Sequence, residues 1–362
     1  MSRPCYHAKQ DGITANSSAI ETDTDTSWFL TNSRIFLKLE NIQPSGSFKI
    51  RGIGNLVLQS IRRHSVSTDD RPLHFFSSSG GNAGLAAVTA STTLGHKCTV
   101  IVPTSTEPSV VLKIKTAGAT DVLVHGDSWT NADAYMRETV MPKAEQLGHK
   151  AIYLPPFDHP DIWTGNATLV HELAHQLPDG HPPDAIVCSV GGGGLFCGIM
   201  QALTTLSWQT ETQVLAVETR GADSLAQSLA ANSLITLPRI TSIATSLGAV
   251  RVAPRAFHYA SPSTLTSASS HAKVYSITLE DTEALASTWR FADDERILTE
   301  PACGVSLAMA YDGRLKQHLP HLKKDSKVVI VVCGGSKVDL ALVEGWKQKF
   351  GARARELGLD RC

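Results

Sequence analysis

Short apolar runs alternate with longer amphipathic segments along most of the chain. The runs consist mainly of Val, Ile, Leu, Ala and Cys, which predicts strands buried on both faces of a sheet. These strands are predicted at 97–102, 185–190, 213–218 and 327–333. Apolar residues at helical spacing predict helices at 81–94, 107–117, 128–147 and 195–206. Because strands that alternate with helices form crossover units, we expect parallel sheets and the α/β fold class.

This alternation occurs in two parts of the chain, which predicts two lobes. Residues 43–146 are expected to form a small lobe, and residues 1–42 with 147–362 a large one. A chain of 362 residues is long enough to build a separate core for each. The segment 256–271 is rich in Ser, Thr and Ala, and its pattern predicts a loop or a loosely packed connection without a chemical role.

Charge and composition then exclude several classes of protein. The 33 Lys and Arg residues nearly balance 34 Asp and Glu, so we expect no binding to nucleic acid or to an anionic membrane surface. No apolar stretch has the length of a membrane span or the pattern of a signal peptide, so we expect a cytoplasmic protein. The seven cysteines are scattered without a C-x-x-C pair, which argues against a disulfide framework or a zinc site. A small molecule is the expected ligand.

One lysine stands among neighbours that are unusual for a surface cation. Lys49 lies in PSGSFKIRGIGN (44–55), after small, hydroxylated and aromatic residues and before an apolar run with glycines. Burial disfavours the charged form of an amine, so Lys49 is a candidate reactive amine.

Four consecutive glycines separate a predicted strand from an apolar helix. They are Gly191, Gly192, Gly193 and Gly194. Their backbone N–H groups and the positive end of the following helix suit a phosphate. One glycine would be enough for a tight turn, so anion binding is the favoured interpretation. The loop is neither a Walker A motif nor G-x-G-x-x-G.

A second polar loop follows the predicted strand near residue 75. It contains Ser79, Gly80, Gly81 and Asn82 and precedes an alanine-rich helix. Hydroxyl and N–H groups at a helix start suit a carboxylate, although ordinary capping by Asn or Ser explains the pattern equally well.

Two further residues stand at the ends of predicted elements. Cys333 ends an apolar strand at the edge where ligands bind in parallel sheets, although such a cysteine is more often a core residue. Glu300 precedes Pro301 and a helix of small residues, where a glutamate usually serves as a cap or a partner of the helix dipole.

A reactive amine, a phosphate cradle, a carboxylate cradle and a neutral group at a strand end would together bind a phosphorylated aldehyde. The chain resembles the fold-type II pyridoxal-phosphate enzymes, most closely the L-serine/L-threonine dehydratases, from about residue 28 to 350. The motifs that carry the resemblance are PSGSFKIRGIGN, SSSGGNAG, PPFDHPDIW, SVGGGGL, ETRGADS, ITSIATSLG, EPACG and VVCGGS. The segment 251–272 matches poorly.

The resemblance implies a fold like that of the tryptophan synthase β-subunit. The large domain (1–42 and 147–362) would bind the cofactor, and the small domain (43–146) would close over the substrate. Each lobe would contain a mostly parallel, twisted sheet flanked by helices.

The resemblance also implies a role for each residue that matches a family motif. Lys49 would be the catalytic Schiff-base lysine. The cofactor would contact Phe48 and Ser246 at its ring, Asn82 at its ring hydroxyl, Gly191, Gly192, Gly193 and Gly194 at its phosphate, and Cys333 at its pyridine nitrogen. The substrate carboxylate would bind to Ser79, Gly80, Gly81 and Asn82. A monovalent cation such as K⁺ would bind to Glu218, Ala222 and Ser224 and to the carbonyls of Leu247 and Ala249.

The implied activity is that of a lyase. It would convert L-serine to pyruvate and ammonia, and L-threonine to 2-oxobutanoate, by β-elimination. A homodimer and a role in amino-acid catabolism and gluconeogenesis belong to the same expectation. The alternatives are a β-replacement synthase or a serine racemase on the same fold, or a ligand-binding relative without turnover.

Overall fold

The computed structural model describes residues 18–21, 33–261 and 271–359, and the chain divides into two compact units. The described part of the first unit is 43–166. The described part of the second unit is 18–21, 33–42, 167–261 and 271–359. Which unit binds the cofactor, and whether the other closes over the substrate, stay predictions.

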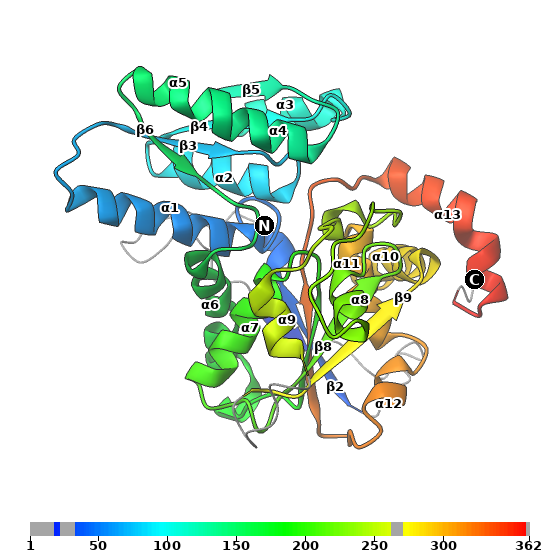
Figure 1. Cartoon of the computed structure of the whole chain (residues 1–362). Coiled ribbons are helices and arrows are strands. Elements are labelled where there is room, and N and C mark those ends of the chain that lie inside the picture. Colours follow the sequence, from blue (N-terminus) through cyan, green and yellow to red (C-terminus); the bar gives the residue numbers. More distant parts are fainter. Residues whose placement is uncertain (1–17, 22–32, 262–270, 360–362) are drawn as a thin grey trace. The chain divides into compact units, whose positions relative to one another are not determined.

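The first unit contains a four-stranded parallel sheet with the order β5-β4-β3-β6 (Figure 1). Its strands are β3 (Leu73–Ser77), β4 (Lys97–Val102), β5 (Asp121–Val124) and β6 (Lys150–Tyr153). Successive residues of β3 enter opposite cores, since Phe75 packs in one apolar cluster and Phe76 in another. Both faces of this sheet are therefore covered, as its continuous apolar runs require.

Helices form both layers around this sheet. The helices of the first unit are α1 (Lys49–Ser65), α2 (Asn82–Thr93), α3 (Pro108–Thr116), α4 (Trp129–Tyr135) and α5 (Met141–Gln146). A π-helical segment, η2 (Met136–Val140), joins α4 to α5. Residues of α1, α2 and α3 pack in the cluster that contains Phe75, and residues of α4, η2 and α5 in the one that contains Phe76.

Two glycines bring α1 close to α6 (Pro160–Gln176). A Cβ at Gly52 would lie 2.6 Å from the side chain of Ile162, and one at Gly165 only 2.2 Å from the carbonyl oxygen of Arg51. Larger residues would separate the helices, so these glycines fix the position of the first turns of α1.

The second unit contains a sheet with the order β1-β2-β10-β7-β8-β9, which is parallel except for β1. Its strands are β1 (Ala19–Glu21), β2 (Arg34–Leu39), β7 (Ala185–Ser189), β8 (Gln213–Thr219), β9 (Val274–Leu279) and β10 (Lys327–Val332). Its helices are α7 (Gly194–Thr205), α8 (Ser224–Ala230), α9 (Pro254–Ala260), α10 (Asp281–Glu295), α11 (Pro301–Leu307), α12 (Arg314–His318) and α13 (Leu340–Glu356). Short helical turns are η1 (Glu40–Ile42), η3 (Pro178–Gly180), η4 (Thr245–Leu247) and η6 (Ala308–Ala310).

The structure confirms the predicted class and its main elements. Each of the four predicted strands and four predicted helices is present within a few residues of its expected bounds. The helix expected at 128–147 contains the π segment, which hydrophobic spacing did not predict. The prediction of a loop at 256–271 is wrong for its first residues, because 256–260 belong to α9. Residues 262–270 lie outside the described residues.

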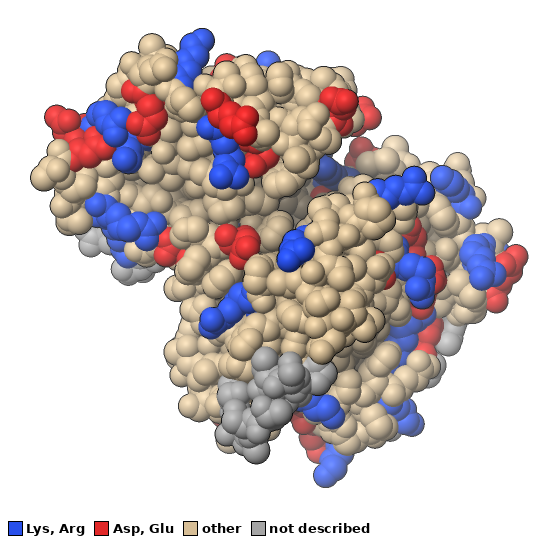
Figure 2. Space-filling view, viewed as in Figure 1, with Lys and Arg blue, Asp and Glu red and all other residues tan. Residues whose placement is uncertain are grey.

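Lysine and arginine side chains are interspersed with acidic ones on the described part of the face that Figure 2 shows. Within the described ranges, no helix combines the length and the apolar character that crossing a bilayer requires.

Candidate functional site

Lys49 is the first residue of α1, and its side chain is half-buried. Its Nζ donates a hydrogen bond to the carbonyl oxygen of Pro156 at 2.8 Å and lies 5.3 Å from the centre of the Phe48 ring. The positive end of a helix dipole disfavours a cation. The predicted amine is therefore anchored and partly shielded from solvent within its own unit.

The segment that supplies the Pro156 carbonyl is itself held by side chains. Trp163 Nε1 donates to the carbonyl oxygen of Phe157 at 3.1 Å, and the backbone N–H of Asp161 donates to His159 Nδ1 at 3.1 Å. In the sequence, this segment, PPFDHPDIW, is one of the motifs that carry the family resemblance. No role was predicted for Pro156, because a backbone carbonyl contact leaves no signal in a sequence.

The loop from Ser79 to Asn82 connects β3 to α2, and its residues are half-buried. Gly81 occupies the N-cap position without a side-chain cap, and Asn82 is the first helical residue. Ser79 Oγ accepts a hydrogen bond from the backbone N–H of Gly81 at 3.2 Å. The Asn82 side chain therefore does not cap α2.

The four glycines lie between β7 and α7, with Gly193 at the N-cap of α7 and φ of +87°. A Cβ at Gly191 would lie 2.9 Å from Leu247 Cα, and one at Gly193 would lie 2.5 Å from the Cβ of Ala256. The loop therefore needs glycine at both positions. A backbone cradle at the start of a twelve-residue helix fits a phosphate group.

Helix α9 and the residue before it pack against this loop. The backbone N–H of Ala253, just before α9, donates to the carbonyl oxygen of Gly192 at 3.0 Å. No role was predicted for this segment, because small residues at a contact carry no chemical signal of their own.

Cys333 follows β10 and is 6 % exposed. Its sulfur lies 3.3 Å from the hydroxyl oxygen of Ser189, the last residue of the neighbouring strand β7. A hydrogen bond from the Cys303 thiol, followed by that of Ser189, lowers the pKa of Cys333, whereas burial raises the pKa of Cys303. Cys333 is thus a hydrogen-bonded thiol at the carboxyl end of β10, in the same unit as the glycine loop.

Glu300 does not cap α11 with its side chain. Its carboxylate, 3 % exposed, accepts a short hydrogen bond from Ser246 Oγ and another from the backbone N–H of Lys337 at 2.8 Å. It therefore ties the turn that contains Ser246 to the loop that follows Cys333. A Cβ at Gly335 would lie 2.2 Å from Glu300 Cδ, so that loop also needs glycine.

The residues predicted to bind a monovalent cation include a fully buried glutamate. Glu218, at 0 % exposure, accepts backbone N–H groups of Leu225 and Ala226 at 2.9 and 2.7 Å. Burial raises the pKa of Glu218 to about 8, although these two hydrogen bonds lower it. Ser224 Oγ is buried and has no hydrogen-bond partner among the described residues. Ala222 and Leu247 are buried, and Ala249 is half-buried.

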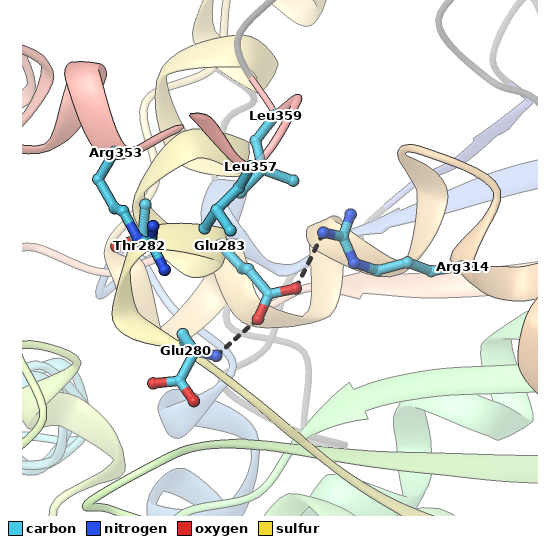
Figure 3. Close-up of a pocket in the computed structure, with 7 residues that line it drawn as sticks. All are labelled: Glu280, Thr282, Glu283, Arg314, Arg353, Leu357 and Leu359. Atoms are coloured by element: carbon cyan, nitrogen blue, oxygen red, sulfur yellow. Dashed lines mark hydrogen bonds and ion pairs between the residues drawn. The ribbon is translucent and has the colours of Figure 1, made fainter. Parts of the chain in front are cut away.

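A separate cavity of about 430 Å³ lies where α10, α12 and the end of α13 meet (Figure 3). Glu283, one of its charged residues, accepts from Arg314 at 2.9 Å and from the backbone N–H of Glu280 at 2.7 Å. These two hydrogen bonds connect the start of α10 to α12 within the second unit. None of the predicted site residues lines it.

The family of pyridoxal-phosphate dependent enzymes matches residues 28–334. An L-serine dehydratase of Saccharomyces cerevisiae is 42% identical over 312 residues, which cover 84% of this chain and 89% of that protein. A catabolic L-serine/threonine dehydratase of the same species is 38% identical over 311 residues, covering 84% and 83%. The crystal structure of an L-serine ammonia-lyase from Rhizomucor miehei superposes with a TM-score of 0.81 at 31% identity, covering 94% of this chain and 99% of that one.

Proposed function

Because the chain belongs to the family of pyridoxal-phosphate-dependent enzymes, we propose that it is a lyase that converts L-serine to pyruvate and ammonia. The observation that carries this proposal is the 42% identity to an L-serine dehydratase over 84% of the chain. The similarity to a catabolic L-serine/threonine dehydratase supports L-threonine as a second substrate. A homodimer and a catabolic role remain predictions from the resemblance, and a cytoplasmic location remains a prediction from the pattern of apolar residues.

When it is bound, pyridoxal phosphate withdraws electrons from the Cα of the attached amino acid, which permits loss of the Cα proton and of a β-substituent. The glycine loop supports the assignment of its phosphate to Gly191–Gly194, because the backbone there has no room for side chains at Gly191 and Gly193. The protein contributes position and electrostatics to this chemistry.

Lys49 would link the cofactor and later take the Cα proton of the substrate at its Nζ. Its half-buried place at the start of α1 supports this role, because the helix dipole disfavours a permanent cation there. The Pro156 carbonyl, 2.8 Å from Nζ, can orient the amine toward one side.

Ser79, Gly80, Gly81 and Asn82 would bind the substrate carboxylate at the start of α2. The helix dipole and the backbone N–H groups of this loop favour an anion. The cation ligands Glu218, Ala222, Ser224, Leu247 and Ala249 are a further part of the proposal, which the buried, unpartnered hydroxyl of Ser224 supports among the described residues.

The test is a panel of amino acids assayed for 2-oxo acid and ammonia with the cofactor-loaded protein. We expect pyruvate from L-serine, 2-oxobutanoate from L-threonine and no product from the Lys49→Ala variant. Borohydride should abolish the visible absorbance of the loaded wild type, which reports the link to Lys49.

Other outcomes identify the alternatives. D-serine without net deamination would indicate a racemase, and turnover only with an added nucleophile would indicate a β-replacement synthase. A protein that stays colourless after addition of the cofactor would indicate a relative without turnover.

A further inference from the structure

The carboxylate of Asp133 accepts hydrogen bonds from two hydroxyl groups on neighbouring strands. Its Oδ1 accepts from Ser78 Oγ at 2.6 Å and from the hydroxyl of Tyr153 at 3.0 Å. Ser78 directly follows β3, and Tyr153 ends β6, whose residues pair with those of β3. One oxygen atom on α4 therefore connects the ends of two strands.

This arrangement is well buried. Ser78 is 1 % exposed and Asp133 is 8 % exposed. A buried carboxylate is costly unless hydrogen bonds compensate for its lost hydration. Arg137 offers little compensation, because its nearest nitrogen is 3.8 Å away and its side chain is 60% exposed. Among the described residues, these two hydroxyls are thus the hydrogen-bond donors close to Asp133, and packing alone does not explain an acid at this position.

The helix that carries Asp133 is also irregular. After Tyr135 it continues as the π segment Met136–Val140, in which Met136 is fully buried. Such insertions are frequent at functional sites, because they change the direction of side chains on one helix face.

Ser78 immediately precedes the loop from Ser79 to Asn82, which is anchored at successive residues. A Cβ at Gly84 would lie 1.8 Å from the carbonyl oxygen of Ser79, so α2 packs directly against this carbonyl. The Ser79 hydroxyl holds the N–H of Gly81. The Ser78 hydroxyl, held by Asp133, is the first of these anchors, and it fixes the direction in which the chain leaves β3.

We propose that Asp133 is a positioning residue: by holding the Ser78 hydroxyl it sets the loop that receives the carboxylate of the amino-acid substrate. This inference rests on the proposed function, which assigns that carboxylate to Ser79–Asn82. Asp133 acts through Ser78, and its own carboxylate stays in the core.

The experiment measures kcat and KM for L-serine and, by calorimetry, the Kd of L-alanine, which has the same carboxylate but no β-leaving group. Ser78→Ala and Asp133→Ala should each raise KM and Kd about tenfold, the scale of one hydrogen bond to a charged group, with a smaller change in kcat. The double variant should resemble Asp133→Ala, because both changes remove the same bond. Asp133→Asn, which keeps the shape and one acceptor oxygen, should restore part of the affinity.

The matched control is Ser60→Ala. Ser60 is 8 % exposed and its hydroxyl donates to the carbonyl oxygen of Leu56 at 2.8 Å within α1, so this variant loses a buried serine bond elsewhere. Its KM and Kd should equal those of the wild type.

Unchanged KM and Kd in Ser78→Ala would overturn the inference, as would an equal loss in Ser60→Ala. If Asp133→Ala does not fold, Ser78→Ala and Asp133→Asn decide. Failure of the proposed function is recognised separately, because the wild type itself would then release no pyruvate or ammonia from L-serine. Failure of this inference alone leaves the wild-type activity intact and the KM and Kd of Ser78→Ala unchanged.

Discussion

The hydroxyl oxygen of Ser189 lies 3.3 Å from the sulfur of Cys333. These residues stand at the carboxyl ends of the adjacent strands β7 and β10, and the glycine loop begins two residues after Ser189. The hydrogen bond therefore connects the predicted phosphate site to the predicted partner of the pyridine nitrogen within one unit.

The side chain at position 333 should determine the ratio of β-elimination to transamination. A thiol is a weak hydrogen-bond partner, whereas the carboxylate of a Cys333→Asp variant would hold a proton on the pyridine nitrogen and strengthen electron withdrawal. We expect slower pyruvate formation from L-serine and more transamination. Both products are measured in one reaction, with Cys98→Ser as a control at another fully buried cysteine. An unchanged ratio of pyruvate to transamination product in Cys333→Asp would show that Cys333 does not have this role.

Addition of one Cβ to the glycine loop should weaken the binding of pyridoxal phosphate. In Gly193→Ala the φ of +87° disfavours alanine, and its Cβ would lie 2.5 Å from that of Ala256. The control is Gly95→Ala, which has a similar φ of +77° but no atom within 4 Å. Both variants carry the cost of about 1 to 2 kcal/mol that the left-handed conformation imposes on an L-residue, but only in Gly193→Ala would relief of the strain and of the contact with Ala256 move the predicted phosphate loop. We therefore expect at least about a tenfold larger Kd for pyridoxal phosphate in that variant only. Equal binding by both variants would exclude this loop as the phosphate site.

His74 should make the stability of the protein depend on pH. Its Nε2 bonds with Thr99 Oγ1 at 2.9 Å, and burial, together with His149 and Lys97, lowers its pKa from 6.5 to about 4. Between these values the unfolded chain takes up a proton that the folded protein does not. The free energy of unfolding should therefore fall as the pH decreases from about 6.5, by about 2 kcal/mol at about pH 5.

Urea unfolding of the wild type and of His74→Gln at about pH 7.5 and about pH 5 checks this expectation. The His74 variant should show a smaller decrease between the two pH values than the wild type. His175→Gln, a change at an exposed position of α6, should keep the wild-type decrease. The same decrease in all three proteins would assign the pH dependence to other groups.

Glu283 should contribute to the stability of the second unit. It forms a capping box with Glu280 at the start of α10 and an ion pair with Arg314, whose side chains are 19% and 11% exposed. Glu283→Ala removes both interactions, so we expect a loss of about 1 to 3 kcal/mol in urea unfolding. Glu356→Ala, which removes an exposed pair with Arg353, should cost less than about 1 kcal/mol. Equal losses of unfolding free energy in the two variants would show that the interactions of Glu283 beside the cavity in Figure 3 stabilise the second unit no more than an exposed ion pair does.

The sequence alone determined the class of the fold, because buried parallel strands and amphipathic helices leave different periodicities. It also determined which residues carry the family motifs, including Lys49, Asn82 and the glycine loop. Periodicity could not predict the π segment after α4, since one extra residue in a helical turn hardly changes the apolar pattern of the whole helix.

Only the tertiary structure decided which groups these residues meet. Lys49 bonds to Pro156, 107 residues away, and Glu300, which the sequence suggested as a cap, bonds to Ser246, 54 residues away. Asp133 reaches Ser78 over 55 residues. A sequence pattern records which face of an element is buried. The partner of a buried polar group depends on how distant elements pack, because its lost hydration can be replaced by any donor or acceptor that the fold brings within reach.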